Sequence, residues 1–328
     1  QENFEYIFRE YHSHLAEGVS YSAEASDLDI CISSLLKPSS EKTSTFIPYT
    51  GLNYILQNNS LGNYDIVLSK LDDPLLDIAE ETLGINPVTR IMSIPADYIE
   101  SSLSSGKRYS NIIAIPLFFA DPDDLDLIQY SDGLAYELIN MTGMLENGGQ
   151  MVVLIKDTAC HNRELRKFRQ HLVDNSNTYK TTVVRVPISN ATKKVNACLV
   201  LVEKATTTTY RRPICMANLD HSIFKTSKGK NAFTLNVSEI IAAVHSEDPQ
   251  YFIKRNPQDF NEDYDFQPTH YTVLDEDRLE ALIKSYTSKG LFDESRGYKS
   301  LIASLYALIK DGNQQYVETL KPLTHNLA

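Results

Sequence analysis

The sequence lacks the marks of a membrane-spanning, secreted or metal-binding protein. Its longest strongly apolar run lies around 112–119 and is far shorter than the roughly 20 residues that cross a bilayer. The segment 1–14 has no basic block followed by an apolar block, as a secretory signal would have. The four cysteines lie far apart and form no C-x-x-C pair, which argues against a zinc site and a disulfide framework. We therefore expect a cytoplasmic protein with reduced thiols and with neither a membrane span nor a metal.

The sequence also lacks an excess of positive charge and the usual marks of several enzyme classes. The 43 acidic residues outnumber the 31 basic ones, and the net charge of -12 repels a phosphate backbone unless basic residues gather on one face. We interpret the basic runs Arg163–Arg169 and Lys225–Lys230 as solvated faces, and His12 and His14 as part of an exposed helix face. No G-x-G-x-x-G, P-loop, G-x-S-x-G or H-E-x-x-H motif is present, so hydride transfer, nucleotide hydrolysis, acyl transfer and zinc proteolysis are not indicated.

Short apolar runs alternate with helical patterns from about residue 43 to 204. This alternation is typical of a mainly parallel sheet with helices on both faces. The turn between Thr181–Val186 and Asn196–Val202 is too short for a helical crossover, so we expect the second of these strands to be antiparallel, at the edge of the sheet. The other predicted strands are Thr45–Pro48, Tyr64–Ser69, Arg90–Ile94, Asn111–Ile115 and Met151–Ile155, and the predicted helices are Asp77–Leu83, Gly133–Leu145 and His161–Val173.

Composition and pattern divide the chain into an N-terminal helical segment (1–42), an α/β domain (43–204) and a C-terminal extension (205–328). The N-terminal segment carries apolar stripes at helical spacing. The Thr-rich run 206–209 marks the start of the C-terminal extension. The hydrophobic content of 42% is enough for a well-buried core. The helices predicted outside the α/β domain are Phe4–Leu15, Leu28–Leu36, Val237–Val244, Arg278–Ile283 and Tyr298–Ile309.

Four short segments contain the ends of successive predicted strands and the residues that follow them, at the edge of the sheet where α/β proteins bind ligands. They are 46–52 (FIPYTGL), 64–74 (YDIVLSKLDDP), 90–97 (RIMSIPAD) and 109–118 (YSNIIAIPLF). In this order they resemble the amino-methyltransferases that modify adenine in DNA, particularly the modification subunits of type I restriction systems. The resemblance runs from about residue 21 to 271 and ends in a segment, 261–271, that we expect to be an extended tail with two aromatic anchors against the core. It implies a seven-stranded, Rossmann-like fold of S-adenosylmethionine-dependent methyltransferases.

The first segment is similar to the family's loop that approaches the methionine part of S-adenosylmethionine. Pro48, Tyr49 and Gly51 match this loop, while Ile47 stands at its acidic position. The glycine matters because it lets the backbone come close to a ligand. The resemblance therefore implies that these residues bind the cofactor, and weakly. An ordinary junction between a strand and a helix is the alternative.

Two aspartates are the further cofactor candidates that the resemblance implies. Asp72 is the nearest counterpart of the carboxylate that accepts hydrogen bonds from the ribose hydroxyls, although it is displaced by one position. Asp97 stands where the family's acidic residue contacts the adenine of the cofactor. Either aspartate could instead cap a helix or form a turn.

The fourth segment occupies the place of the family's catalytic Asn-Pro-Pro-Phe motif. Here the residues are Ile115, Pro116, Leu117 and Phe118. In the family, the asparagine and a backbone carbonyl accept the two hydrogens of the target amino group, and the aromatic ring stacks on the flipped base. Isoleucine cannot accept a hydrogen bond, so the charge that develops on the amine would lack one of its stabilising contacts.

Three functions remain open at this point. The chain could be an active but divergent adenine methyltransferase, a methyltransferase-fold interaction subunit without activity, or an unrelated α/β nucleotide-binding protein. The substituted motif favours lost or altered catalysis, although a shared fold does not establish a function. Because the chain is acidic, we expect DNA to be bound only together with partner subunits, such as a specificity or restriction subunit.

Overall fold

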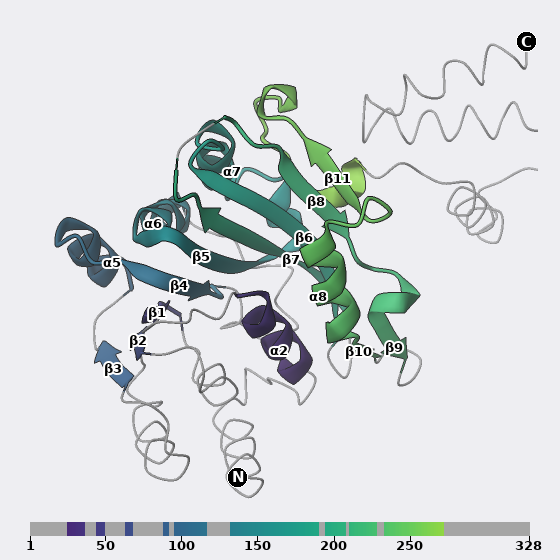
Figure 1. The fold of residues 1–328 in the computed structure, drawn as a ribbon, viewed down its shortest axis with the longest axis horizontal. Helices are drawn as coiled ribbons and strands as arrows, with labels where there is room; N and C mark the ends of the chain where they lie inside the picture. Colours follow the sequence, from purple (N-terminus) through teal and green to yellow (C-terminus); the bar gives the residue numbers. More distant parts are fainter. Residues whose placement is uncertain are drawn as a thin grey trace, which may run out of the picture. The chain divides into compact units, whose positions relative to one another are not determined.

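One nine-stranded sheet forms the centre of the protein (Figure 1). The computed structural model describes residues 25–36, 44–49, 63–67, 88–91, 95–116, 132–189, 194–207, 210–227 and 233–271. The strand order is β11-β8-β6-β7-β5-β4-β1-β2-β3. The strands are β1 Ser44–Ile47, β2 Asn63–Val67, β3 Val88–Ile91, β4 Tyr109–Ala114, β5 Leu145–Lys156, β6 Tyr179–Ser189, β7 Lys194–Lys204, β8 Ile214–Asn218 and β11 Phe252–Arg255. A separate pair joins β9 Lys225–Ser227 to β10 Phe233–Leu235.

The sheet is parallel on one side and mixed on the other. Strands β1 to β5 pair only in parallel with one another, as the alternation of strands and helices predicts. Strand β7 is antiparallel to both of its neighbours, β5 and β6, which confirms the predicted direction of Asn196–Val202. Its predicted place at the edge is wrong, because β8 pairs with the other side of β6 and β11 pairs with β8. These two strands extend the predicted seven-stranded sheet to nine.

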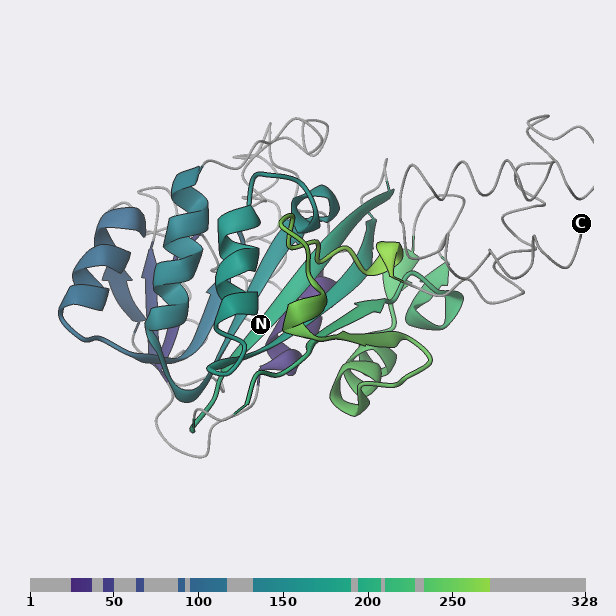
Figure 2. The same ribbon diagram turned by 90° about the horizontal axis from the view of Figure 1, so that it is seen from above.

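Helices cover both faces of the sheet (Figure 2). Helices α5 Pro95–Ser104, α6 Asp132–Gly143 and α7 Arg166–Asp174 run side by side on one face, while α2 Ala25–Leu35 and α8 Val237–Ser246 lie on the other. The core between α2, α8 and the sheet is apolar and includes Ile32, Ile47, Leu199 and Val244. Short 3-10 helices occur at η2 Asp157–Cys160, η3 Ser222–Phe224, η4 Pro257–Asp259 and η5 Pro268–His270.

Most predicted elements within the described residues have a counterpart, and α5 is the main helix that the sequence did not predict. The predicted helices 4–15, 77–83, 278–283 and 298–309 lie outside the described residues, as do His12 and His14. The division at residues 42 and 204 stays a prediction, although β8 and β11 join the sheet from beyond 204. By its internal contacts, the chain separates into Gln1–Gln267 and Pro268–Ala328.

The basic run on α7 contains one residue that is buried, against our prediction of a solvated face. The Arg169 side chain is 1% exposed. Its guanidinium donates four hydrogen bonds of 2.6 to 3.0 Å to main-chain carbonyls of Ala159, Asn162, Asp263 and Tyr264. The last two belong to the segment that resembles the family's closing signature. The buried cation therefore joins this segment to η2 and to the loop before α7, since four of its five N–H groups donate to four separate acceptors.

The part of the tail up to Gln267 is held to the core by further contacts. The Phe266 ring is 1% exposed and packs edge-on against Phe260, and the Phe266 amide donates to the Cys160 carbonyl at 2.8 Å. Of the two predicted aromatic anchors, one is therefore confirmed, at Phe266. All four cysteines are buried and free of disulfides, and among the described residues no helix is long and apolar enough to cross a membrane.

Candidate functional site

The ends of β1 and β4 bring the first and fourth sequence segments together. The two strands pair in parallel, with Phe46 opposite Ile112, so that continuing this register places Tyr49 level with Ile115. Parallel strands present their carboxyl ends at the same edge of a sheet, where α/β folds bind ligands. Four of the predicted site residues thus lie at this edge: Pro48 and Ile115 are buried, whereas Tyr49 and Pro116 are partly exposed.

The Tyr49 side chain is held by a carboxylate that the sequence did not single out. Its hydroxyl donates a hydrogen bond of 2.5 Å to Oε2 of Glu137 on α6. Burial, together with this hydrogen bond and the negative charge of Glu137, raises the pKa of Tyr49 well above its usual value. The tyrosine therefore remains a neutral donor. No sequence signal links the two residues, which lie 88 positions apart.

The Ile115 side chain belongs to the apolar core. It is 3% exposed and is part of the same buried cluster as Ile32 on α2 and Ile47 on β1. The position where the family has a hydrogen-bond acceptor thus contributes packing in this chain. Leu117 and Phe118 lie outside the described residues.

The remaining cofactor candidates are only partly described. Asp97 is exposed in the first turn of α5, two positions after Pro95, which begins the helix. A proline at the start and an acid in the first turn both favour helix initiation, so Asp97 has a structural role that does not depend on a ligand. Gly51 and Asp72 lie outside the described residues. A single cleft that contains all five cofactor candidates therefore stays a prediction.

A second polar cluster lies beneath α5, away from the strand ends. Asp65, in the middle of β2, pairs with Lys107 at 2.5 Å and accepts hydrogen bonds from Tyr109 at 2.6 Å and Tyr98 at 3.2 Å. The Phe46 ring packs against both tyrosine rings. Burial would raise the pKa of Asp65, but Lys107 and Tyr109 outweigh it and lower the pKa. This carboxylate is fully engaged in holding β2, β4 and α5 together.

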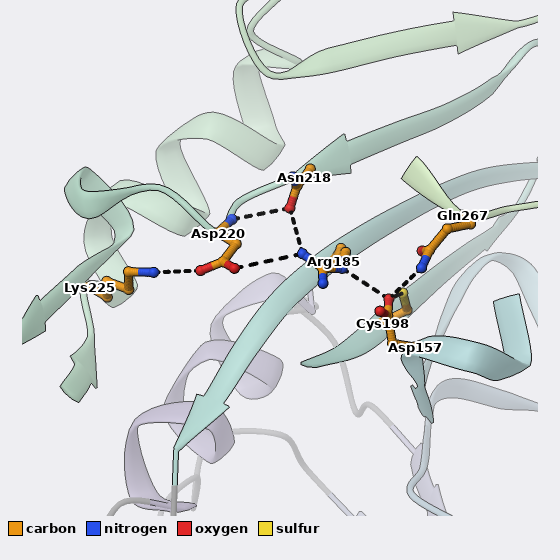
Figure 3. Close-up of polar contacts among 7 residues, drawn as sticks. All are labelled: Asp157, Arg185, Cys198, Asn218, Asp220, Lys225 and Gln267. Atoms are coloured by element: carbon orange, nitrogen blue, oxygen red, sulfur yellow. Dashed lines mark hydrogen bonds and ion pairs between the residues drawn. The ribbon is translucent and has the colours of Figure 1, made fainter. Parts of the chain in front are cut away.

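A third polar group, the strand-end network, lies where β5 and β8 end (Figure 3). Arg185 on β6 contacts Asp157 at 3.0 Å, Asn218 at 3.2 Å and Asp220 at 3.7 Å. Lys225 pairs with Asp220 at 2.5 Å. The two basic side chains thus face two carboxylates, and their charges cancel within the network.

The tail reaches this network through Gln267. Its side-chain amide donates to Oδ1 of Asp157 at 2.9 Å, and the thiol of Cys198 lies 3.6 Å from the same oxygen (Figure 3). Burial raises the pKa of the Cys198 thiol well above its usual value, so the sulfur stays protonated and unreactive. The arrangement joins β5, β6, β7 and the tail, and it has no activated nucleophile.

No group of His, Cys, Asp and Glu side chains suited to a metal ion is present in the part of the chain that the structure describes.

No protein-family model and no curated protein matches the sequence. Solved structures do match. The methyltransferase subunit of a type I restriction-modification system from Streptococcus thermophilus has a TM-score of 0.55 at 14% identity, over 77% of this chain and 59% of that one.

A structure from work on the assembly and conformational transition of the type I restriction-modification system gives a TM-score of 0.53 at 14% identity, over 88% of this chain and 66% of that one. The chain therefore spans less than two thirds of either matched structure. At such identities, the likeness concerns the fold. It confirms the predicted α/β fold of the S-adenosylmethionine-dependent methyltransferase type.

Proposed function

We propose that the chain is a DNA adenine methyltransferase-like protein, similar to the modification subunit of a type I system, with divergent or impaired catalysis. It binds S-adenosylmethionine weakly and meets DNA in the cytoplasm only as part of an assembly with specificity or restriction subunits. The fold shared with such subunits supports the proposal. The observation that carries it is the Ile115 side chain, which is packed into the core at the end of β4.

The residues present fit the cofactor in part. Pro48 and Tyr49 follow β1, where the methionine part of the cofactor would be held. Asp97 lies in α5, the helix that follows β3. The Glu137 carboxylate next to Tyr49 supplies a negative group at the same strand end, which suits a cofactor that bears positive charge. When bound, S-adenosylmethionine supplies a methyl group on a sulfonium ion. Gly51 and Asp72 complete the set that the resemblance implies.

The expected defect lies in activation of the target amine. A side-chain acceptor at position 115 would stabilise the positive charge that grows on the amine nitrogen during transfer. Losing one well-placed polar contact of this kind costs about 3 to 4 kcal/mol, which is roughly a 10²- to 10³-fold loss in rate. The buried Ile115 also favours the second candidate, a non-catalytic interaction subunit, because its position now serves packing.

Transfer of labelled methyl groups from S-adenosylmethionine to adenine-rich duplex DNA tests the proposal. We expect no measurable transfer by the natural chain and a gain by Ile115→Asn. Since a buried amide without a full set of partners costs roughly 1 to 3 kcal/mol, thermal unfolding of Ile115→Asn must be recorded alongside, with Ile115→Val as the apolar control. Robust transfer by the natural chain would contradict the proposal.

A further inference from the structure

The Glu137 carboxylate lies beside the end of β1, where it contacts Tyr49. Its Oε2 accepts the Tyr49 hydroxyl at 2.5 Å, and both side chains are partly exposed. Among the described residues, Tyr49 is the one that hydrogen-bonds this carboxylate. A carboxylate has about four lone-pair sites, so Glu137 retains acceptor capacity beyond the one hydroxyl.

By the resemblance, the position that carries an acidic residue in the family's β1 loop is Ile47 in this chain. Ile47 is fully buried in the cluster beneath α2 and cannot reach a ligand at the strand end. The methionine part of S-adenosylmethionine carries an ammonium group, and an ammonium group is bound most strongly by a carboxylate that is already oriented. Glu137 approaches the same loop from α6, and its contact with Tyr49 fixes its direction.

We propose that Glu137 binds the ammonium group of the methionine part of the cofactor and takes the place of the acidic residue that the β1 loop lacks. This inference rests on the proposed cofactor binding. Tyr49 acts as a positioning residue: its hydroxyl donates to one carboxylate oxygen, which turns the other oxygen toward the ligand. The neutral state of Tyr49 suits this role, because an ionised phenol would repel the carboxylate.

Two ligands that differ in the amino-acid part distinguish a contact between Glu137 and the ammonium group from a general effect of Glu137 on the shape of the site. S-adenosylhomocysteine contains the ammonium group, whereas 5′-methylthioadenosine lacks the whole amino-acid part and keeps the nucleoside. Calorimetric titration of each ligand into the natural chain, Glu137→Gln and Tyr49→Phe measures the contribution of the ammonium contact. Glu137→Gln keeps an acceptor for the Tyr49 hydroxyl and removes only the charge.

We expect Glu137→Gln to bind S-adenosylhomocysteine about 10- to 100-fold more weakly than the natural chain, as for the loss of one hydrogen bond to a charged group. Binding of 5′-methylthioadenosine should not change, and Tyr49→Phe should lose less than Glu137→Gln. The matched control is Glu146→Gln, because Glu146 also accepts one hydroxyl, from Ser110 at 2.9 Å. Glu146 lies near the start of β5, at the opposite edge of the sheet, and its variant should bind both ligands normally.

The outcomes distinguish the inference from the proposed function. If the natural chain binds neither ligand, cofactor binding itself is wrong, and the role of Glu137 is wrong with it. If the natural chain binds S-adenosylhomocysteine and Glu137→Gln binds it equally well, cofactor binding stands and the inference is wrong. An equal loss for both ligands in Glu137→Gln would also overturn it, since Glu137 would then only maintain the shape of the loop.

Discussion

Removal of the Arg169 guanidinium should destabilise the protein more than removal of any exposed basic side chain of α7. Each hydrogen bond to a charged group contributes about 1.5 to 3 kcal/mol, so the four bonds to carbonyls amount to about 6 to 12 kcal/mol. Burying the guanidinium costs several kcal/mol. The difference leaves about 3 to 5 kcal/mol as the expected loss for Arg169→Met, which keeps the apolar stem.

The tail should respond locally as well. Tyr264 adopts a left-handed backbone conformation, with φ of 49°, which is unfavourable for a residue with a side chain. Arg169 bonds the carbonyls of Asp263 and Tyr264 and so holds this conformation in place. In Arg169→Met, the tail should therefore become sensitive to protease cleavage near Tyr264 at denaturant concentrations where the sheet is still folded.

Urea unfolding followed by circular dichroism measures the global effect. The matched control is Arg166→Met on the same helix, whose partly exposed side chain loses one hydrogen bond to the Glu262 carbonyl and a cation–π contact with the Tyr264 ring. We expect this control to lose about 1 kcal/mol or less. Arg169→Lys should lose most of what Arg169→Met loses, because an ammonium group cannot reproduce the planar fork. If Arg169→Met and Arg166→Met differ by less than about 1 kcal/mol, the offset between hydrogen bonding and burial has been misjudged.

Two further predictions concern one ion-pair cluster and one glycine. Burial would raise the pKa of Glu247, but Lys180 at 2.7 Å and Lys254 at 2.5 Å outweigh it and lower the pKa to about 2. Glu247→Gln should therefore lower the unfolding free energy at pH 7 by about 1 kcal/mol, after allowance for solvent screening. The difference between the variant and the natural chain should vanish as the pH falls from about 4.5 to about 2. A difference that persists at pH 2 would refute the assignment. A Cβ on Gly149 would lie 2.9 Å from the Tyr109 carbonyl. Gly149→Ala should therefore lose about 1 to 3 kcal/mol of unfolding free energy and melt at a lower temperature. An unchanged melting temperature would show that the β4–β5 contact can relax.

The parts of the fold that could be predicted are those fixed by local patterns. Strands β4 and β5 contain the continuous apolar runs 112–114 and 151–155, as expected for strands that are buried on both faces, and the short turn before β7 determines its direction. Helix α5 escaped prediction because only Ile99 and Ser102 are buried along it, which leaves almost no apolar periodicity. Strand β8 was missed for a different reason, since its place depends on pairing with β6 across the sheet, and no local pattern records such a partner.

The same distinction applies to the candidate site. Pro48 and Ile115 lie at the predicted strand ends because each directly follows an apolar strand. Glu137 could not be found in this way, since its role depends on α6 packing beside the end of β1. The burial of Arg169 was also hidden, because a basic residue on a charged helix looks the same in sequence whether it faces water or main-chain carbonyls.

The carboxyl edge of the sheet now divides into two chemically different halves. In the proposed function, the half formed by β1 and β4 supplies the Glu137 carboxylate for a cationic cofactor, whereas the buried Ile115 offers no side-chain acceptor for an amine. In the half formed by β5, β6 and β8, Arg185 and Lys225 are already paired with carboxylates of the chain itself. The chain as a whole carries a net charge of -12. Since the affinity of a protein for DNA depends mainly on cations that contact phosphates, this charge balance supports the proposal that the protein binds DNA only together with partner subunits.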